Sequence, residues 1–272
     1  MMKEKLLSIR GLRKSYGDFE ALKGIDIDFN PGEFVVLIGS SGAGKSTFIR
    51  CINRMVDPSE GTLEFNGVAT ERLRGAALRR QRSQIGMIFQ HYNLIGRVNV
   101  IKNVMHGLLG KVPAWKSLLG LYPEQEKRRA VELLEEVGLS GQIYKRADAL
   151  SGGQMQRVGI CRAIMQNPKL LLADEPIASL DPKSSDVVMD TLKRFTNQRG
   201  LTCIVNLHQV DYARKYADRI VGMKAGQIVF DGTPEELTDD IVKEIYAGVT
   251  ESTQSETIHL PTAIGGVAHA RI

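Results

Sequence analysis

The stretch Gly39-Ser40-Ser41-Gly42-Ala43-Gly44-Lys45-Ser46 decides how this chain is built. It follows a short apolar run at 34–38 and opens a segment in which Phe48, Ile52 and Met55 recur at helical spacing. Strand, glycine-rich turn and helix in this order are typical of a phosphate-binding loop, because the glycines let several backbone N–H groups point at one anion. The stretch therefore predicts a nucleoside triphosphate site, and a chance glycine turn is a poor account of it.

Two side chains of the loop have specific tasks in this prediction. Lys45 is expected to reach the β- and γ-phosphates as a point charge, and the Ser46 hydroxyl is expected to hold Mg²⁺. The positive end of the following helix adds to the attraction for phosphate.

Composition indicates a globular protein with a sizeable core. The chain has 272 residues, 43% of them hydrophobic, which fits one large domain or one and a half small ones. No run approaches the roughly 18 apolar residues of a membrane span, and no signal segment opens the chain, so we expect it in the cytoplasm. Three scattered cysteines read as buried thiols, and a net charge of +5 is too small to indicate nucleic-acid binding.

Short runs before the loop predict an antiparallel β layer beside a parallel core. Residues 6–38 contain short alternating or apolar runs separated by turns, and 61–67 ends in an Asn-Gly turn. Tyr16 lies on a loop signal in this layer, where an aromatic ring can stack on a purine. From spacing alone, an ordinary half-buried tyrosine is the better interpretation.

The middle of the chain, from about 85 to 165, reads as mostly helical. The clearest helix is 124–137, where one apolar stripe ends at Gly138. Five arginines between 72 and 82 favour a solvated helix face over a nucleic-acid patch, because no aromatic residues lie between them. Gly and Pro breakers around apolar residues at 107–123 fit a partner-binding surface and a packed loop about equally well.

Ser151-Gly152-Gly153-Gln154 precedes another helical segment. Ser151 is a natural N-cap, and two glycines expose the backbone N–H groups of the helix start. This is either a second anion-binding helix end or a plain helix cap, and the short motif alone does not decide between them.

Two apolar strands end in polar side chains. The run 169–175 closes with Asp174 and Glu175, and ligand sites lie at the carboxyl ends of parallel strands. Asp174 is expected to hold Mg²⁺ through water, and Glu175 to orient or deprotonate the attacking water. The run 201–208 ends in His208, which is placed to donate to the γ-phosphate.

The last part of the chain is predicted to hold a hairpin, a helix and a tail. The hairpin covers 220–232, and a short helix is expected to begin near Thr233. The composition of 249–272 predicts a poorly ordered tail with no assignable role.

Taken together, these motifs resemble those of the ATP-binding cassette (ABC) ATPases along nearly all of 5–248. The loop matches the Walker A motif, Leu170–Glu175 the Walker B strand, and Ser151–Gln154 the family signature, which is rare elsewhere. Gln90 resembles the Q-loop glutamine, Asp181 belongs to a D-loop match at 179–182, and His208 resembles the switch histidine. Tyr16 falls where the family stacks adenine. The resemblance therefore favours a role in ATP binding over the ordinary half-buried tyrosine that spacing alone suggests.

The resemblance implies an α/β fold of the P-loop NTPase class, with a mostly parallel core sheet, an antiparallel β layer and a helical signature subdomain. It implies an ATPase domain over 1–248, with the helical subdomain at about 88–165. The implied catalytic residues are Glu175, His208 and Gln90, and the implied Mg²⁺ ligands are Ser46, Gln90 and Asp174. The implied ATP-binding residues are Tyr16, Gly39, Ser40, Ser41, Gly42, Ala43, Gly44, Lys45, Ser46, Thr47, Ser151, Gly152, Gly153, Gln154 and Asp181.

The resemblance also implies partners. Two copies are expected to meet head to tail, with each ATP between one phosphate loop and the other signature helix, which supplies a ligand for the helix end at Ser151. A multi-span permease is expected to dock near 91–122, with an extracytoplasmic substrate-binding protein in the same system and no nucleic acid. The subunit is then peripheral, on the cytoplasmic face of the inner membrane.

Within the family, several stretches look most like the phosphonate-import branch. They are 89–94, the 115–122 insert, 174–182 and 207–213, in which Gln209 replaces a common acidic residue. An importer of polar amino acids or phosphate would keep every catalytic residue and differ only in the docking segment. A non-transport cassette of DNA repair or translation typically has coiled-coil insertions or two fused cassettes, and this chain has neither.

Overall fold

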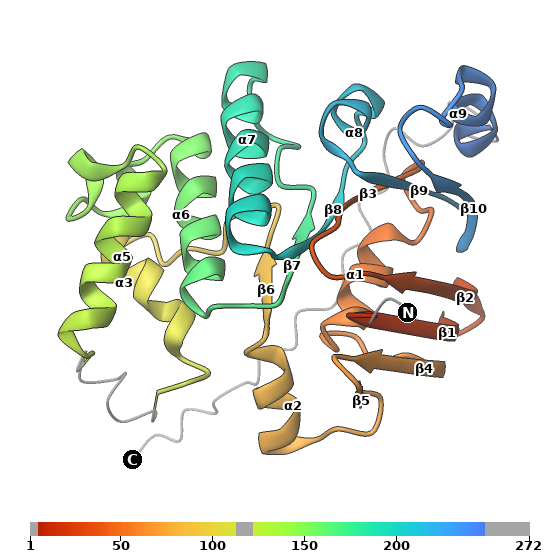
Figure 1. The fold of residues 1–272 in the computed structure, drawn as a ribbon, viewed down its shortest axis with the longest axis horizontal. Coiled ribbons are helices and arrows are strands. Elements are labelled where there is room, and N and C mark those ends of the chain that lie inside the picture. The colour runs from red at the N-terminus through yellow and green to blue at the C-terminus, as the bar shows by residue number, and fades with distance from the viewer. Residues whose placement is uncertain (1–4, 113–121, 248–272) are drawn as a thin grey trace, which may run out of the picture.

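A computed structural model describes residues 5–112 and 122–247, and the fold rests on a six-stranded sheet (Figure 1). From one edge to the other, the sheet holds β10 (Gln227–Gly232), β9 (Arg219–Lys224), β3 (Phe34–Ile38), β8 (Thr202–Asn206), β7 (Leu170–Asp174) and β6 (Ile85–Ile88). All neighbouring pairs are parallel except β9 and β10, which form the expected hairpin. The parallel core is therefore confirmed.

The central strands are mainly apolar, apart from polar residues at strand ends such as Asp174 and Asn206, because both faces of the sheet are covered. In β3, Phe34, Val36 and Ile38 belong to one hydrophobic core, and Val35 and Leu37 belong to another. Every residue of β3 and β7 is buried, as a doubly covered parallel sheet requires.

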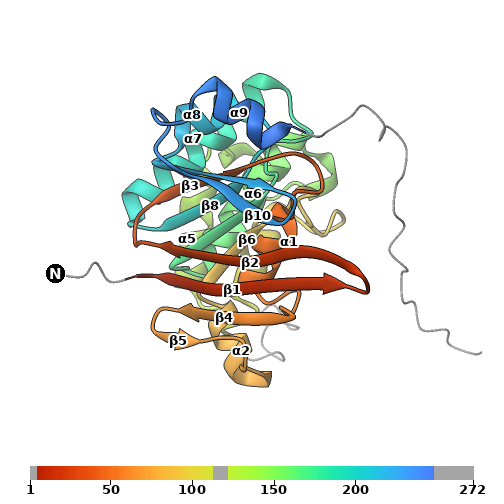
Figure 2. The same cartoon turned by 90° about the vertical axis from the view of Figure 1, so that its right-hand side faces the viewer.

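One core lies between this sheet and the predicted antiparallel layer, with α1 (Lys45–Ile52) contributing to it. The layer has the order β2 (Phe19–Phe29), β1 (Leu7–Tyr16), β4 (Glu60–Phe65) and β5 (Val68–Ala69). Figure 2 shows these strands side by side, with β5 next to α2 (Gly75–Arg82) at one end. The antiparallel layer is confirmed, including the turn between β4 and β5, where Asn66 and Gly67 both have positive φ.

Helices form the second core on the other face of the sheet (Figure 1). They are α3 (Val100–Met105), α5 (Glu124–Glu136), α6 (Gly152–Met165) and α7 (Pro182–Arg199), with short 3₁₀ turns at His106–Leu108, Ser140–Gln142 and Ala147–Ala149. The helix predicted at 124–137 is confirmed as α5, and Gly138 follows it with a φ of 70°. None of the helices in the described ranges has the length and apolar character needed to cross a bilayer.

Two predictions about elements were wrong. The stretch after 85 begins with β6, a strand of the main sheet, and not with helix. The last helix, α9 (Asp239–Tyr246), begins six residues after Thr233, because Thr238 caps it and Asp239 and Asp240 occupy its first turn. Thr233 instead starts a turn in which its own N–H donates to the Glu236 carboxylate.

Other predictions are confirmed or fall outside the described ranges. Cys51, Cys161 and Cys203 are all buried thiols. The arginine-rich stretch forms α2, with Arg79, Arg80 and Arg82 exposed as expected of a solvated face. Most of the 115–122 insert and all of the 249–272 tail lie outside the described residues.

Candidate nucleotide site

The loop at 39–46 connects the end of β3 to α1, and its glycines are required by the surrounding backbone. Gly44 has a φ of 99°, and a side chain there would place its Cβ 2.7 Å from the Ala21 carbonyl oxygen. Gly39 has a φ of 149°, and a Cβ there would collide with the Met223 carbonyl. Among the described residues, no side chain caps α1 at Gly44, so its first N–H groups face the loop.

Lys45 is buried, with 4% of its surface exposed, and its ammonium group stays inside the loop. Nζ donates to the carbonyl oxygens of Gly39 at 2.7 Å and Ser40 at 3.0 Å. Burial lowers the pKa of Lys45, while the charges of Glu175 and Asp174 act in the opposite direction. The loop thus holds one positive charge at its centre, where a triphosphate would need it.

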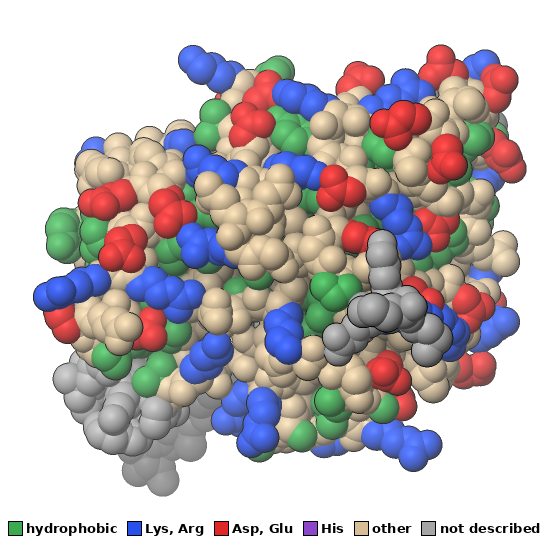
Figure 3. All heavy atoms as spheres, in the orientation of Figure 1, with side chains coloured by type: hydrophobic (Ala, Val, Ile, Leu, Met, Phe, Trp, Pro, Cys, Tyr) green, Lys and Arg blue, Asp and Glu red, His purple; other side chains and the backbone are tan. Residues whose placement is uncertain are grey.

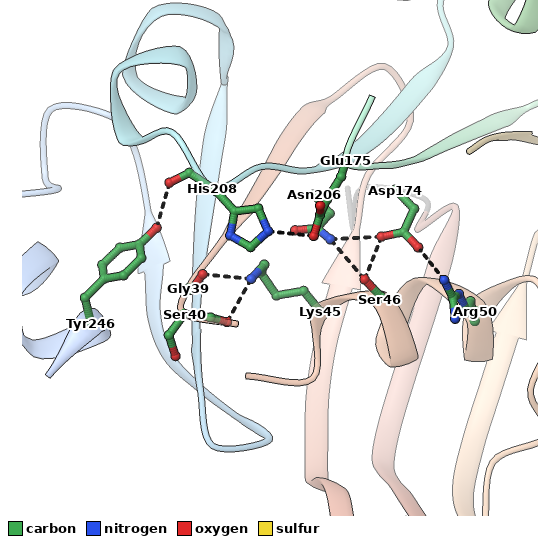
Figure 4. A network of polar contacts seen from close by, with 10 residues as sticks. All are labelled: Gly39, Ser40, Lys45, Ser46, Arg50, Asp174, Glu175, Asn206, His208 and Tyr246. Carbon is green, nitrogen blue, oxygen red and sulfur yellow. Dashed lines mark hydrogen bonds and ion pairs between the residues drawn. The ribbon is translucent and has the colours of Figure 1, made fainter. Parts of the chain in front are cut away.

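Asp174 lies at the end of β7, in contact with three other side chains (Figure 4). Its Oδ1 accepts from Ser46 Oγ at 2.7 Å and from Asn206 Nδ2 at 2.9 Å. Its Oδ2 lies 3.3 Å from Nη2 of Arg50, which is one helical turn after Ser46 on α1. These side chains therefore join the loop helix to the ends of β7 and β8.

The oxygens around Asp174 fit a hard cation. Ser46 supplies a hydroxyl and Asp174 a carboxylate, and Asn206 holds both in place by donating from Nδ2. In the described part of the chain, no three His, Cys, Asp or Glu side chains come together as a metal cluster. This combination suits Mg²⁺, which usually takes one or two carboxylates and completes its shell with water and phosphate oxygens.

Glu175 follows Asp174 directly but points to His208 (Figure 4). Nε2 of His208 lies 2.6 Å from Oε1 of Glu175. The hydrogen bond from His208 lowers the pKa of Glu175 against the opposing effect of burial. Glu175 has a φ of 52°, a left-handed conformation that is costly for this residue type, and its N–H donates to the Asn206 carbonyl at 3.2 Å. The backbone is thus held so that the carboxylate and His208 meet.

Three residues of this network were not predicted as site residues: Arg50, Asn206 and Tyr246. Arg50 lies at i+4 from Ser46, and Asn206 ends a strand two residues before His208, so both positions carried a signal in the sequence. Tyr246 comes from α9, and its hydroxyl donates to the His208 carbonyl at 3.1 Å. No local pattern connects Tyr246 to residues almost forty positions earlier.

Gln90 and Tyr16 lie near the site without joining the network. Ile88 pairs with Ala173, so Gln90 follows β6 at the same edge of the sheet where Asp174 lies. Tyr16 ends β1 with 49% of its surface exposed, and the Lys14 ammonium lies 4.9 Å from its ring centre. Lys14 pairs with Leu22, which lies beside Gly44, so this part of β1 and β2 borders the phosphate loop.

The segment at 151–154 starts α6 with a capping box. Ser151 accepts from the Gln154 N–H, and the Gln154 side chain accepts from the Ser151 N–H at 3.0 Å. Asp181 caps the neighbouring helix α7 through the Ser184 N–H at 3.0 Å. Interaction with the Ser184 hydroxyl, and then with this N–H, lowers the pKa of Asp181. A pocket of about 200 Å³ lies between the two helix starts. Among the described residues, no hydrogen bond joins Ser151 to the phosphate loop.

Comparison with known proteins identifies the family of this chain. A family model for the ABC transporters matches residues 22–178. The chain belongs to the ABC transporter family. Two relatives of this ABC transporter chain match over most of their length. The phosphonates import ATP-binding protein PhnC 2 of Oceanobacillus iheyensis is 53% identical over 89% of this chain and 95% of its own. The phosphonates import ATP-binding protein PhnC of Treponema denticola is 49% identical over 90% of this chain and 96% of its own.

Solved cassettes of the family share the fold. The ADP conformation of MJ1267, an ATP-binding cassette of an ABC transporter, has a TM-score of 0.79 and 32% identity over 90% of this chain and 99% of its own. A dimeric, post-hydrolysis cassette, MJ0796 bound to ADP and Pi, has a TM-score of 0.72 and 32% identity over 84% of this chain and 98% of its own. The expected ABC ATPase fold is therefore confirmed.

Proposed function

We propose that this chain binds and hydrolyses ATP and thereby drives the import of phosphonates through a partner permease. The observation that carries the proposal is the convergence of Lys45, Ser46, Asp174, Glu175 and His208 at one edge of the sheet, in a chain about half identical to two phosphonate-import subunits. The geometry of the site supports ATP hydrolysis, and the two relatives support phosphonates as the imported substrate.

Each side chain has a distinct role in the proposed reaction. Lys45 and the N–H groups of the loop bind the phosphates, and Tyr16 stacks on the adenine. Ser46, Asp174 and Gln90 would hold Mg²⁺, which, when bound, neutralises charge on the phosphate oxygens. Glu175 accepts a proton from the attacking water, and His208 orients that carboxylate and donates to the γ-phosphate.

The second anion site suggests a dimer. Ser151 is exposed, and among the described residues no hydrogen bond joins its helix start to the phosphate loop of the same chain. In a head-to-tail pair, Ser151, Gly153 and the neighbouring Asp181 of one copy would face the nucleotide on the other copy's loop. A dimeric solved cassette at 32% identity supports this arrangement.

The proposed import of phosphonates implies two further partners, a permease and a substrate-binding protein. The permease is proposed to dock near 91–122, and an extracytoplasmic binding protein is proposed to supply the phosphonate. The chain would then work as a peripheral subunit on the cytoplasmic face of the inner membrane.

Growth on phosphonate tests this proposal. Cells carrying Lys45→Ala are expected to fail on a phosphonate as sole phosphorus source and to grow normally on phosphate, because the variant cannot bind the triphosphate. The matched control is Lys127→Ala, which removes a half-exposed ammonium group from α5. Normal growth of the Lys45 variant on phosphonate would contradict the proposal. So would a partner binding protein that takes amino acids and ignores phosphonates in calorimetry.

A further inference from the structure

Two exposed aromatic side chains occupy the tip of the β1–β2 hairpin. Tyr16 is the last residue of β1 and Phe19 the first of β2, and they pair directly across a turn formed by Gly17 and Asp18. Tyr16 is 49% exposed and Phe19 is 63% exposed. Side chains opposite each other in an antiparallel pair lie on the same face, with Cβ atoms roughly 4.5–5.5 Å apart. A ligand on the ring of Tyr16 is therefore within reach of Phe19.

Exposure alone does not mark Phe19 as functional, because single apolar side chains are common on protein surfaces. Figure 3 shows this on one face of the molecule, where small groups of hydrophobic side chains lie among many charged ones. The interpretation of Phe19 therefore depends on which face of the hairpin its side chain occupies.

Phe19 lies on the face of the hairpin that borders the phosphate loop. Side chains alternate between the two faces of a strand, so Lys14 shares a face with Tyr16, and its ammonium group lies 4.9 Å from the Tyr16 ring centre. Lys14 pairs with Leu22, and a Cβ at Gly44 would lie 3.0 Å from Cδ2 of Leu22. This face thus extends from Phe19 and Tyr16 to the glycine that precedes α1.

The opposite face of the hairpin holds an ion pair. Arg13 and Glu20 are the chain neighbours of Lys14 and Phe19, and Nη1 of Arg13 lies 2.5 Å from Oε1 of Glu20. Glu60 of β4 lies on the same side, 3.9 Å from Nε of Arg13. Because neighbours along a strand point to opposite faces, this ion pair independently places Phe19 on the side of the phosphate loop.

The rings of Tyr16 and Phe19 do not pack on each other. In the part of the chain that the structure describes, no ring-to-ring contact involves either residue. Neighbouring aromatic rings in water normally gain free energy by packing together. Both rings instead keep accessible surface on the side of the loop, where a flat ligand can cover it.

We propose that Phe19 is a second aromatic contact for the nucleotide base, so that Tyr16 and Phe19 form one surface that favours purines. The inference rests on the proposed function, in which Tyr16 stacks on the adenine. A stacked purine has two fused rings and extends from Tyr16 towards Phe19, whereas a pyrimidine has one ring, which Tyr16 alone covers. Phe19 therefore strengthens the binding of purine nucleotides and adds little to that of pyrimidine nucleotides.

Calorimetry on the full chain tests this role with ATP, CTP and inorganic tripolyphosphate, which has no base. Mg²⁺ is left out so that ATP is not hydrolysed. Phe19→Ala is expected to weaken ATP binding roughly three- to tenfold and to leave the affinities for CTP and tripolyphosphate near wild type. In hydrolysis assays with Mg²⁺, its KM for ATP should rise at unchanged kcat, because Phe19 contacts no reacting atom. Tyr144→Ala is the matched control, since Tyr144 is an exposed aromatic residue outside the hairpin.

Phe19→Trp tests direct contact with the base. This variant should keep wild-type affinity for ATP, and the fluorescence of the added indole should fall when ATP binds, because the two ring systems stack. Tyr144→Trp should show no such change, and the natural Trp115 is present in both variants.

Three results would overturn the inference. Phe19→Ala could bind ATP as wild type does, it could lose affinity for CTP or tripolyphosphate as much as for ATP, or ATP could leave the fluorescence of Phe19→Trp unchanged. Each of these leaves the proposed function intact as long as the wild-type chain binds ATP and Lys45→Ala does not. A wild-type chain that binds no ATP would instead contradict the proposed function itself.

Discussion

Asp174 and Glu175 are adjacent in the chain, yet their carboxylates have different partners. Asp174 accepts from Ser46 and Asn206, whereas Glu175 pairs with His208. The left-handed backbone at Glu175 turns the second carboxylate away from the first. Because the His208 hydrogen bond lowers the pKa of Glu175, this carboxylate is ionised at neutral pH and can accept a proton. One residue thus suits cation binding and the next suits base catalysis.

Replacing Glu175 by glutamine tests this division. Glu175→Gln should bind ATP with near wild-type affinity and hydrolyse it roughly 10²- to 10⁴-fold more slowly, because an amide cannot take the proton of water. Nucleotide binding and phosphate release measured on the same protein would check both parts. Glu136→Gln is a suitable control, since Glu136 pairs with Arg199 at the surface. Hydrolysis by Glu175→Gln at the wild-type rate would mean that another group is the base.

At the scale of elements, α9 supports the loop that carries His208. The Tyr246 hydroxyl donates to the His208 carbonyl, and Ile245 of the same helix packs on Gly222 of β9. Burial raises the pKa of Tyr246. The phenol is therefore joined to the loop that carries His208 (Figure 4).

Removing that hydroxyl should affect turnover more than binding. Tyr246→Phe loses one neutral hydrogen bond, worth about 0.5–1.5 kcal/mol, so kcat should fall roughly two- to tenfold while the dissociation constant for ATP stays unchanged. Tyr144→Phe is the control, because 78% of the surface of Tyr144 is exposed. An equal loss in both variants, or a change confined to ATP affinity, would rule out a positioning role for Tyr246.

The elements also show how far the sequence predicts the structure. The strands ending at Ile38 and Asp174 were predictable because apolar runs followed by glycine or carboxylates mark the ligand edge of a parallel sheet. The first helix was placed well, but it ends at Ile52, and Met55 is half exposed beyond it. β6 was missed because four buried residues carry no period that separates strand from helix. The contacts of Tyr246 depend on packing between distant elements, which no local pattern records.

At the scale of the whole molecule, one chain holds two helix starts that we propose to bind phosphate, and no hydrogen bond among the described residues joins them. The start of α1 carries Lys45 and Ser46, whereas the start of α6 carries Ser151 and lies beside α7. The capping box satisfies the hydroxyl and the N–H of Ser151 within α6. The side chain is nevertheless exposed at the surface of the single chain. A head-to-tail dimer would place it against the nucleotide of the partner.

This arrangement predicts complementation between two inactive variants. Ser151→Arg should bind ATP on its intact loop but fail to hydrolyse it, because the large cation blocks the partner's nucleotide. Lys45→Ala should fail because it binds no triphosphate. In a mixed dimer, the loop of the first variant meets the normal helix start of the second, which restores one site, while the other site carries both changes.

An equal mixture should therefore recover about a quarter of wild-type hydrolysis, since about half of the dimers are mixed and each has one intact site of two. Phosphate release by each variant alone and by the mixture measures this directly. Mixing Ser151→Arg with Glu175→Gln gives a second test with a different lesion at the loop site. Because a chain that completed its own site could never be rescued by another defective chain, recovery in both mixtures requires a site shared between copies. If Ser151→Arg alone abolishes ATP binding, Ser151 acts within its own chain and the dimer arrangement is wrong.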